Sequence, residues 1–431
     1  MKTRLRKYRL KVTSSVMIYA LFIMVIVTIL IGVVISTAYY NYLQKLTFQI
    51  EKQLQHNVHS GIAILLSNKM VDYAHPRLIS LYKEDKDSTY LSKELFGMFD
   101  LIRSRSAWKK FSYEKVAFAG GFFARKKTFP ALYLTNHYSP LCLVGRSKIT
   151  GDCYLPQKGV QRGYIDGRSF EGDRFVKGKT EFSEPSLPEL KGQYRKNLME
   201  EVKKRYLQPE KYQALNMEDV PDEGLVHSFC VHTEVVYDAD AILLRNIKLK
   251  NNIVVISEKE VLISKTADLM NVVIYAPNIF IESGFRGAIQ CFAADTLFVG
   301  SNVSLDFPSA VCLMNHGLSH ISQTLKIASG TNISGVVCID LANNSGAAQP
   351  DVYIEKNVQV TGAFYSNVSV QFFGKVQGSL YTNGFYVKRL SGNYINHLLD
   401  VEINKDELPS QFVGPDLFVS NTENKIMKWL N

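Results

Sequence analysis

The sequence predicts a mainly β fold. A single-pass N-terminal transmembrane helix and a stalk helix lead into a parallel β-helix (β-solenoid), for which a right-handed coil is favoured. Residues 16–38 include no charged residue, and apolar residues at helical spacing continue to position 67. Further along, apolar–x–apolar triplets recur at intervals near 18 residues. Such triplets predict short strands, and their regular repeat is typical of turns that bury an apolar face by stacking.

The composition is that of a folded protein with unevenly distributed charge. Of its 431 residues, 46% are hydrophobic and 21% are charged, which excludes a disordered or collagen-like chain. Six of the first 11 residues are basic and none is acidic, which leaves +4 of the net charge of +10 for the rest. That small surplus gives no reason to expect nucleic-acid binding. Six cysteines are too few for a disulfide-dense scaffold.

The segment 16–38 is expected to cross a membrane once. As a helix, its 23 residues would extend about 34 Å, and the hydrocarbon core of a bilayer is about 30 Å thick. A cleaved signal peptide is the alternative, but its apolar core usually has about 7–15 residues. Tyr39, Tyr40 and Tyr42 follow the longer segment found here and suit a membrane interface. A retained anchor is therefore favoured.

The basic segment 1–15 predicts the orientation, because positively charged flanks stay in the cytoplasm. The chain is thus expected in the inner (cytoplasmic) membrane, with the lipid bilayer as a partner and its C-terminal domain periplasmic or otherwise extracytoplasmic.

A stalk helix is expected over residues 39–67. Its apolar residues recur every three or four positions: Leu43, Leu46, Ile50, Leu54, Val58, Ile62 and Leu65. The favoured interpretation packs this helix on the chain's own ectodomain. The alternative packs it against partner anchors, so self-association through the stalk stays open. The arrangement of anchor and stalk, over about 60 residues, resembles pilin-like proteins, including the minor pseudopilins of secretion systems.

Six segments carry the repeat. They begin at Val261, Ile279, Leu297, Leu325, Val352 and Val368. A small residue usually precedes the second apolar run of a segment: Gly287, Ser309, Gly335, Gly362 or Gly378. Glycine supplies backbone freedom where the chain bends. An upstream copy over 141–156 has Gly151 at the same offset from its start.

Composition divides the remaining chain into expected segments. In order they are a mixed or helical segment (68–114), a first part of the solenoid (115–183), a partly helical insertion (184–222), the main solenoid (223–390) and a C-terminal cap (391–431). A helical patch is expected near 91–105, and the charged run 200–205 lies in the insertion. An antiparallel sandwich is the alternative for the repeats, although it requires no superposable repeat.

The repeat over 141–180 and 250–390 resembles bactofilin-like, polymer-forming parallel β-helix proteins and membrane-anchored β-helix proteins of Bacteroidota. The resemblance implies a parallel β-helix. Left-handed hexapeptide acyltransferases repeat at a similar interval, but aromatic residues and irregular steps break that tight spacing here.

Two motifs suggest metal chemistry. Asp238 and Asp240 follow an apolar strand, and metal-dependent glycosyltransferases use such a pair to hold a cation on a nucleotide diphosphate. The motif is short, and a β-solenoid is not a nucleotide-binding α/β sheet. His316 and His320 have the spacing of two metal ligands on a helix, but their glycine-containing context indicates a corner loop. No metal or cofactor is therefore expected.

Polysaccharide-cleaving β-helices gather acidic and basic side chains on the outer face of neighbouring turns. The acids of the repeat, Asp295, Asp306, Asp340 and Asp351, fall mainly at corners and share no register. No catalytic residue is therefore expected.

Cys312 and Cys338 occupy equivalent repeat positions, and Cys291 lies close to that register. Neighbouring turns are about 4.8 Å apart, so a disulfide is within reach, but a ladder of buried thiols is favoured. The aromatic residues near the end of the repeat are assigned to packing rather than to carbohydrate stacking: Tyr381, Phe385 and Tyr386.

The sequence favours a non-catalytic structural or assembly component of the cell envelope, with protein partners in a pilin-like or secretion apparatus. The alternative is a protein that binds or cleaves envelope polysaccharide. A smooth, uncharged lateral face would favour assembly. A groove lined by three or more acidic or basic residues, with aromatic residues nearby, would favour carbohydrate chemistry.

Overall fold

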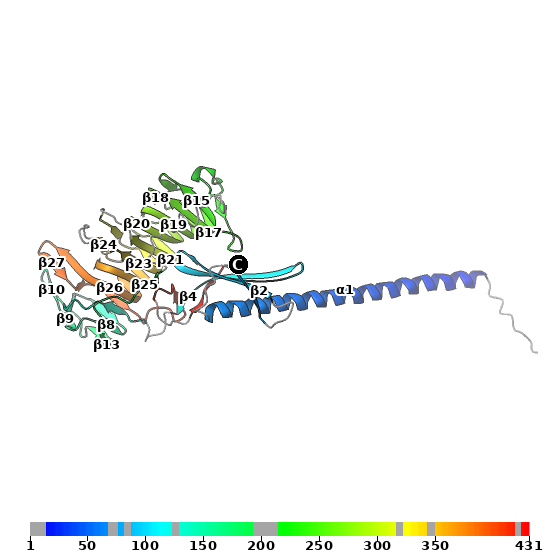
Figure 1. The fold of residues 1–431 in the computed structure, drawn as a ribbon, viewed down its shortest axis with the longest axis horizontal. Helices are drawn as coiled ribbons and strands as arrows, with labels where there is room; N and C mark the ends of the chain where they lie inside the picture. Colours follow the sequence, from blue (N-terminus) through cyan, green and yellow to red (C-terminus); the bar gives the residue numbers. More distant parts are fainter. Residues whose placement is uncertain are drawn as a thin grey trace, which may run out of the picture.

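The computed structural model describes eight stretches of the chain: residues 14–67, 76–81, 88–122, 129–192, 214–315, 322–342, 350–418 and 424–430. A single long helix projects from a mainly β domain (Figure 1). Most strands of this domain pair in parallel. The predicted mainly β class is confirmed, as is an N-terminal helix long and apolar enough to cross a membrane.

Helix α1 (Ser14–Ser67) is 54 residues long and packs on the β domain only near its C-terminal end. The apolar segment 16–38 is exposed along its whole length. Four residues spaced along one face of the last turns are buried: Leu54, Val58, Ile62 and Leu65. The structure confirms for these turns that the predicted stalk segment is helical and packs on the β domain of the same chain, whereas Leu43 and Leu46 are exposed.

An antiparallel sheet receives the helix. Its strands are β1 (Arg77–Ser80), β2 (Ser88–Phe96), β3 (Phe99–Trp108), β4 (Phe111–Phe122), β30 (Val413–Gly414) and β31 (Asn424–Trp429). The two C-terminal strands both pair with β4. Ile62 and Leu65 of the helix share an apolar cluster with Leu91, Ile102 and Ala119 of the sheet.

The helical patch expected near 91–105, within the mixed segment 68–114, is wrong, because β2 and β3 form a hairpin there. Alternate residues of β3 face opposite sides: Ile102 packs toward α1, and Leu101 packs toward the rest of the domain. Polar residues of β3, Asp100 and Ser104, are buried as well. The segment therefore lacks the apolar–polar alternation by which a strand is usually recognised.

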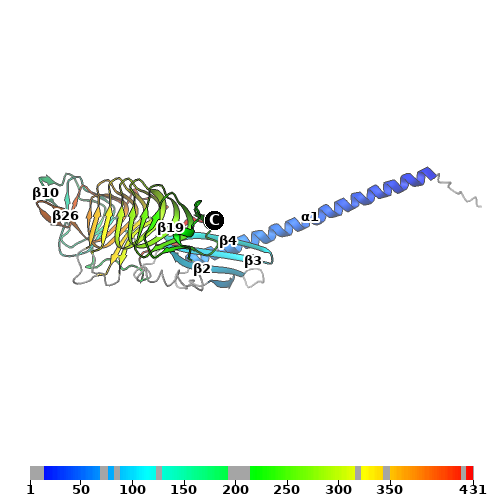
Figure 2. The same ribbon diagram turned by 90° about the horizontal axis from the view of Figure 1, so that it is seen from above.

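The remaining strands lie between residues 132 and 404. They are β5 (Leu132–Leu134), β6 (Leu141–Val144), β7 (Lys148–Thr150), β8 (Cys153–Leu155), β9 (Val160–Arg162), β10 (Tyr164–Ile165), β11 (Arg168–Ser169), β12 (Val176–Lys177), β13 (Thr180–Phe182), β14 (Leu225–Val226), β15 (Glu234–Asp238), β16 (Ile242–Leu244), β17 (Lys248–Ser257), β18 (Glu260–Ile263), β19 (Asp268–Ile281), β20 (Arg286–Val299), β21 (Ser304–Asn315), β22 (Thr324–Ile327), β23 (Asn332–Leu341), β24 (Asp351–Ile354), β25 (Gln359–Phe372), β26 (Lys375–Arg389), β27 (Gly392–Ile395), β28 (His397–Leu399) and β29 (Glu402–Asn404). The β10–β11 hairpin and the β26–β27 pair are antiparallel. All other pairings among these strands are parallel, and we call the strands so paired the parallel stack (Figure 2).

The register of the parallel stack follows the sequence repeat. Five of the six repeat starts form one in-register column: Val261, Ile279, Leu297, Leu325 and Val352. Because Tyr353 pairs with Gln371, the next residue in this column is Val370, two residues beyond the expected start at Val368. Parallel pairing excludes the antiparallel sandwich for these segments.

A column of small residues marks one corner of the stack. Ser309, Gly335, Gly362 and Gly378 are paired in register, and the three glycines have φ values of +145°, +136° and +148°. A Cβ on Gly362 would lie 2.0 Å from the carbonyl oxygen of Gly335. This corner therefore requires glycine for backbone conformation and for space. Gly287 pairs with Leu305 and lies outside this column.

The upstream strands occupy an unexpected place. Strand β5 pairs in parallel with β26, while β6 and β7 pair with β28 and β29. Residues 132–182 therefore extend the stack beyond its C-terminal repeats and do not lie ahead of residue 223. The expected first part at 115–183 is also wrong at its start, because β4 belongs to the antiparallel sheet. The sequence pattern of a segment indicates that it forms a strand, but it does not indicate which other strand it pairs with.

The expectation that 391–431 caps the stack is wrong as well. Strands β28 and β29 add to the stack, and the chain then returns along one of its faces to end in β31. Four residues of this returning segment pack there: Leu408, Phe412, Leu417 and Phe418. The end they were expected to cover is already occupied by residues 132–182.

Part of the insertion at 184–222 is described, and that part holds the 3-10 helix η2 (Met217–Asp219) but no α-helix. The charged run 200–205 and residues 1–13 of the basic segment lie outside the described residues.

Replacing Gly362 with alanine should destabilise the domain by roughly 2 kcal/mol or more, because the new Cβ meets a backbone oxygen and the φ is unfavourable. Chemical denaturation of the detergent-solubilised full chain would measure this loss. Gly192→Ala is the control, since nothing lies within 4 Å of a Cβ at that position. Equal stabilities of the two variants would contradict the assigned corner geometry.

Lys405 should make stability depend on pH. Its ammonium group is buried and donates to Ser379 Oγ at 2.8 Å, and burial lowers the pKa of Lys405 to about 7. An unfolded lysine keeps its proton up to a pH of about 10.4. Between those values the unfolded chain binds more protons, so the free energy of unfolding rises with pH, by at most about 1.4 kcal/mol per unit.

Denaturation between pH 7 and 9 should show this rise in the wild type and in Lys259→Met, which alters an exposed lysine. Lys405→Met should lack it. Identical slopes in all three proteins would show that Lys405 does not contribute.

Candidate functional site

The acidic pair proposed as a metal site forms a turn. The Asp240 N–H donates to Asp238 Oδ1 at 2.9 Å, and the Asp240 carboxylate pairs with Lys259 at an exposed position. Among the residues that the structure describes, no group of three His, Cys, Asp or Glu side chains is placed to hold a metal ion. His316 and His320 lie outside these residues.

The acids of the repeat are not gathered into one site. The buried Asp340 accepts a hydrogen bond from Asn367 Nδ2 at 3.0 Å. Asp351 accepts one from the Tyr386 hydroxyl at 3.1 Å. Asn315 Nδ2 lies 3.4 Å from Asp295 Oδ1. The contacts of Asp340 and Asp295 join paired strands, and the contact of Asp351 reaches from β24 to β26 across β25. All three contacts have a structural role.

The cysteines are free thiols in the structure. Cys312 and Cys338 pair in register as expected, but Cys291 pairs with Val311 and faces the opposite side of the sheet. All three are fully buried, and burial raises the pKa of each thiol above its ordinary value. A protonated, inaccessible thiol is a poor nucleophile.

Cys312 and Cys338 belong to a longer column that faces outward from the stack, and we call this side the covered face. Its members are Tyr237, Ile256, Tyr275, Phe292, Cys312, Cys338, Tyr365, Tyr381, Tyr133 and Tyr154. Rings on adjacent turns stack: the centroids of Tyr275 and Phe292 are 4.7 Å apart, and those of Tyr133 and Tyr154 are 5.5 Å apart.

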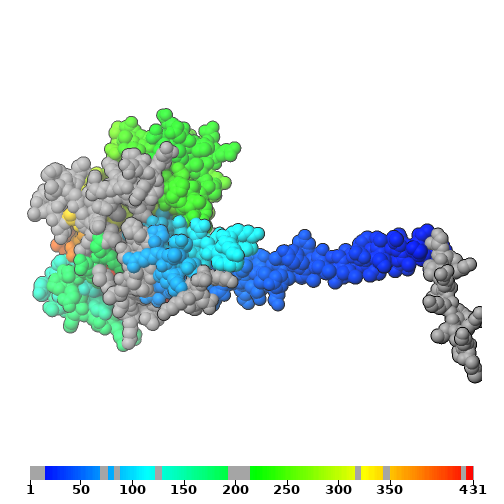
Figure 3. Space-filling view, turned by 45° about the vertical axis from the view of Figure 1, so that its right-hand side comes forward, coloured from blue at the N-terminus to red at the C-terminus, as the bar shows by residue number. Residues whose placement is uncertain are grey.

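The antiparallel sheet and the returning C-terminal segment cover this column. Phe96, Phe118 and Phe229 share its apolar cluster, and the ring of Phe418 lies 4.8 Å from that of Tyr381. The assignment of Tyr381 and Phe385 to packing agrees with their burial, while Tyr386 is half-buried. Figure 3 shows the blue and cyan sheet against the green strands of the stack.

Gln290 joins the antiparallel sheet to the stack. Its side chain is 2% exposed, accepts a hydrogen bond from the Met98 N–H at 2.8 Å and donates to the Phe96 carbonyl at 3.1 Å. The turn that it holds contains Gly97 with φ +65°, and a Cβ there would lie 2.3 Å from Gln290 Oε1. A buried amide thus satisfies two backbone groups that would otherwise be costly to bury.

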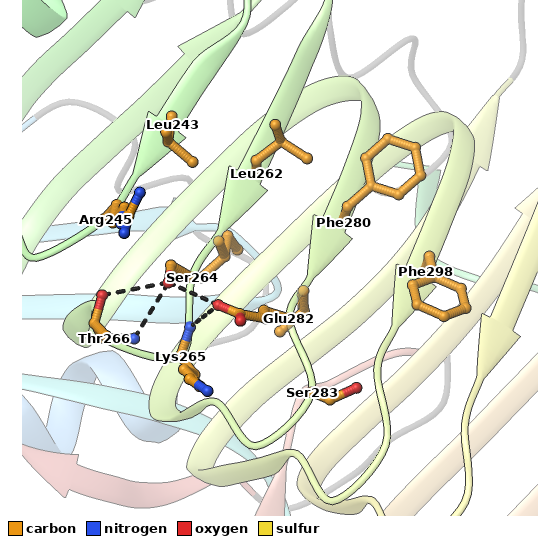
Figure 4. Close-up of a pocket in the computed structure, with 12 residues that line it drawn as sticks. Leu243, Arg245, Leu262, Ser264, Lys265, Thr266, Phe280, Glu282, Ser283 and Phe298 are labelled. Atoms are coloured by element: carbon orange, nitrogen blue, oxygen red, sulfur yellow. Dashed lines mark hydrogen bonds between the residues drawn. The ribbon is translucent and has the colours of Figure 1, made fainter.

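No described segment covers a second outward column, which we call the open ladder. It consists of Leu243, Leu262, Phe280 and Phe298, paired in register on successive turns. The leucines are 52% and 36% exposed and the phenylalanines are half-buried. Figure 4 shows the four side chains side by side along a hollow of about 780 Å³.

The rim of this hollow is polar and carries a small positive charge. Glu282 accepts hydrogen bonds from Ser264 Oγ at 2.7 Å and from the Lys265 N–H at 2.8 Å, and these bonds, with the charges of Lys265 and Arg245, lower the pKa of Glu282 (Figure 4). The Glu282 carboxylate is thus ionised and engaged within the rim. Arg245 and Lys265 are exposed and form no ion pair with another described residue.

The column continues beyond the hollow with a basic residue and an aromatic one. Lys326 follows Phe298 in register and Tyr353 follows Lys326. The Lys326 ammonium lies 5.9 Å from the centroid of the Phe298 ring and 6.0 Å from that of Tyr353, and it pairs with Glu355 at 3.2 Å. The cation therefore bridges two rings and closes one end of the open ladder.

The site was not predicted, although the sequence contained a signal for it. The members of the open ladder are the central residues of the apolar triplets 242–244, 261–263, 279–281 and 297–299. A central residue points away from the core. Four apolar central residues in succession therefore indicate an outward apolar column, whereas a solvated face would place polar residues there. The hollow has the charged groups and neighbouring aromatics set out above as favouring carbohydrate chemistry.

Comparison with known proteins identifies no relative. No protein-family model matches the chain, and neither curated sequences nor solved structures give a significant match. The resemblances to bactofilin-like and pilin-like proteins therefore stay predictions.

Replacing Gln290 with leucine should destabilise the protein by roughly 2–4 kcal/mol, because two buried backbone groups lose their partner. The antiparallel sheet should also become more accessible, so limited proteolysis between β2 and β4 should accelerate together with the loss of stability. Gln161→Leu, at an exposed position of β9, is the control. An unchanged cleavage rate in Gln290→Leu would show that the sheet docks without this amide.

Proposed function

We propose that the chain is a single-pass membrane protein whose parallel stack is a right-handed β-solenoid outside the cytoplasm, and that it acts without catalysis as a structural component of the cell envelope. Six basic residues ahead of the apolar helix support this orientation. In-register parallel pairing over successive turns supports the solenoid.

The observation that carries this proposal is the rigid connection between anchor and stack. The C-terminal turns of α1 are buried against the antiparallel sheet, and Gln290 with the covered face holds this sheet on the stack. A catalytic domain could be tethered by a flexible linker, whereas a structural component has to keep a defined position relative to the membrane. Asp340 and Asp351, considered above for chemistry, are engaged in hydrogen bonds within the stack, and Cys291, Cys312 and Cys338 are buried free thiols.

A second candidate function is the binding of envelope polysaccharide, and the open ladder favours it. The hollow combines two exposed cationic side chains, an ionised glutamate and two half-buried phenylalanines. Both functions fit one molecule, because a structural component can hold a ligand on a free face.

The proposal is tested by topology and by association. A C-terminal reporter that is active only outside the cytoplasm should be active in the wild type, and replacing the basic residues of 2–11 with glutamate should reduce its activity several-fold. Covalent cross-linking in cells, followed by detergent extraction, should recover the chain with protein partners.

A reporter that is active only on the cytoplasmic side would reject the orientation. A chain recovered strictly alone, with the anchor intact, would reject the assembly role.

A further inference from the structure

We propose that the open ladder binds a glycan chain that carries carboxylates, with sugar rings stacked on Phe280 and Phe298 and carboxylates paired with Arg245 and Lys265. This deepens the second function above, and it rests on the proposed function only in placing the domain outside the cytoplasm.

The open ladder is apolar, and no segment among the described residues covers it. On the covered face, outward residues at the same repeat spacing are buried by the antiparallel sheet. In the open ladder, Leu243 and Leu262 remain 52% and 36% exposed, beside two half-buried rings. Contiguous apolar patches on a protein surface usually mark an interaction site.

The open ladder runs across the strands, along the axis of the stack, and the strands between its first and last members are paired with neighbours on both sides. A peptide laid along the ladder would therefore cross the strands and could not pair with them. Strand β16, at the end of the ladder, pairs among the described strands with β18 alone, and its other edge lies beside the ladder rather than along it. Rings presented about 4.8 Å apart instead offer flat apolar surfaces, which suit the C–H faces of successive sugar rings.

The rim of the hollow beside the open ladder carries polar and charged side chains. Ser264, Thr266 and Ser283 bring hydroxyl groups to the edge of the hollow, where sugar hydroxyls could exchange hydrogen bonds with them. Glu282 is already satisfied within the protein. Arg245 and Lys265 then present two positive charges that this carboxylate only partly offsets. A ligand with carboxylates complements that surplus, because guanidinium and ammonium groups bind carboxylates strongly.

The length of helix α1 favours a glycan over membrane lipid as the ligand of the open ladder. Residues 39–53 of α1 lie between the apolar segment and the first buried residue of the packed face, Leu54. Fifteen helical residues extend about 22 Å, so the β domain is held away from the bilayer. We therefore assign the apolar and basic surface to a glycan rather than to lipid headgroups.

Binding is to be measured with the full chain in detergent micelles, by calorimetry with an oligogalacturonide and with a neutral maltooligosaccharide of equal length. The oligogalacturonide should bind saturably and more tightly than the neutral chain. The Phe280→Ser/Phe298→Ser variant should bind it roughly tenfold more weakly or worse, because two stacking surfaces are lost. The Arg245→Gln/Lys265→Gln variant should lose the preference for the acidic chain and most of its salt dependence.

Phe182→Ser is the matched control, because Phe182 is 72% exposed on β13, at the opposite end of the stack. All the substituted side chains are exposed or half-buried, and thermal unfolding will confirm that each variant is folded. Phe182→Ser should bind like the wild type.

The proposal is overturned by an absence of saturable binding to the oligogalacturonide, or by binding that the Phe280→Ser/Phe298→Ser variant retains. Binding of anionic phospholipid vesicles that requires these phenylalanines, without binding of the glycan, would reassign the surface to lipid and also overturn it. The same variant should keep its topology and cross-linked partners. Failure of glycan binding is thereby distinguishable from failure of the proposed structural role.

Discussion

In-register stacking is the constraint on which the rest of the structure depends. Each outward residue of one turn lies between the equivalent residues of its neighbours, about 4.8 Å away. A preference at one repeat position therefore becomes a column along the whole domain. The glycine corner, the aromatic column of the covered face and the open ladder are three results of this constraint. They differ in what the rest of the chain places over them.

That difference gives the domain two distinct sides. The covered face is buried inside the protein, because its rings pack against the antiparallel sheet. The same sheet packs against helix α1 on its other side. The open ladder has the same columnar arrangement but faces solvent, with charged groups at its rim. One column is thus buried between the stack and the sheet that carries α1, and the other is left exposed on the surface.

Sequence reasoning predicts local features well and long-range pairing poorly. The long apolar helix, its packed C-terminal turns and five repeat starts follow from spacing alone, because each is a short-range pattern. The hairpin of β2 and β3 is not predictable in this way, because buried polar residues such as Asp100 and Ser104 remove the apolar–polar alternation that marks a strand. The place of β5 beside β26 was beyond reach, since no local pattern records a partner 248 residues away. No charged motif indicates the open ladder, whose signal lies in the apolar central residues of four successive triplets.

Strands from the first half of the chain pair with strands from its C-terminal part, and this order affects how the domain folds during synthesis. Strands β5, β6 and β7 are synthesised long before their partners β26, β28 and β29. Strand β4 likewise waits for β31. The nascent chain thus exposes unpaired strand edges until these later strands have been made. Such late closure is slow and prone to aggregation, so the unfinished domain has to be shielded until the later strands pair.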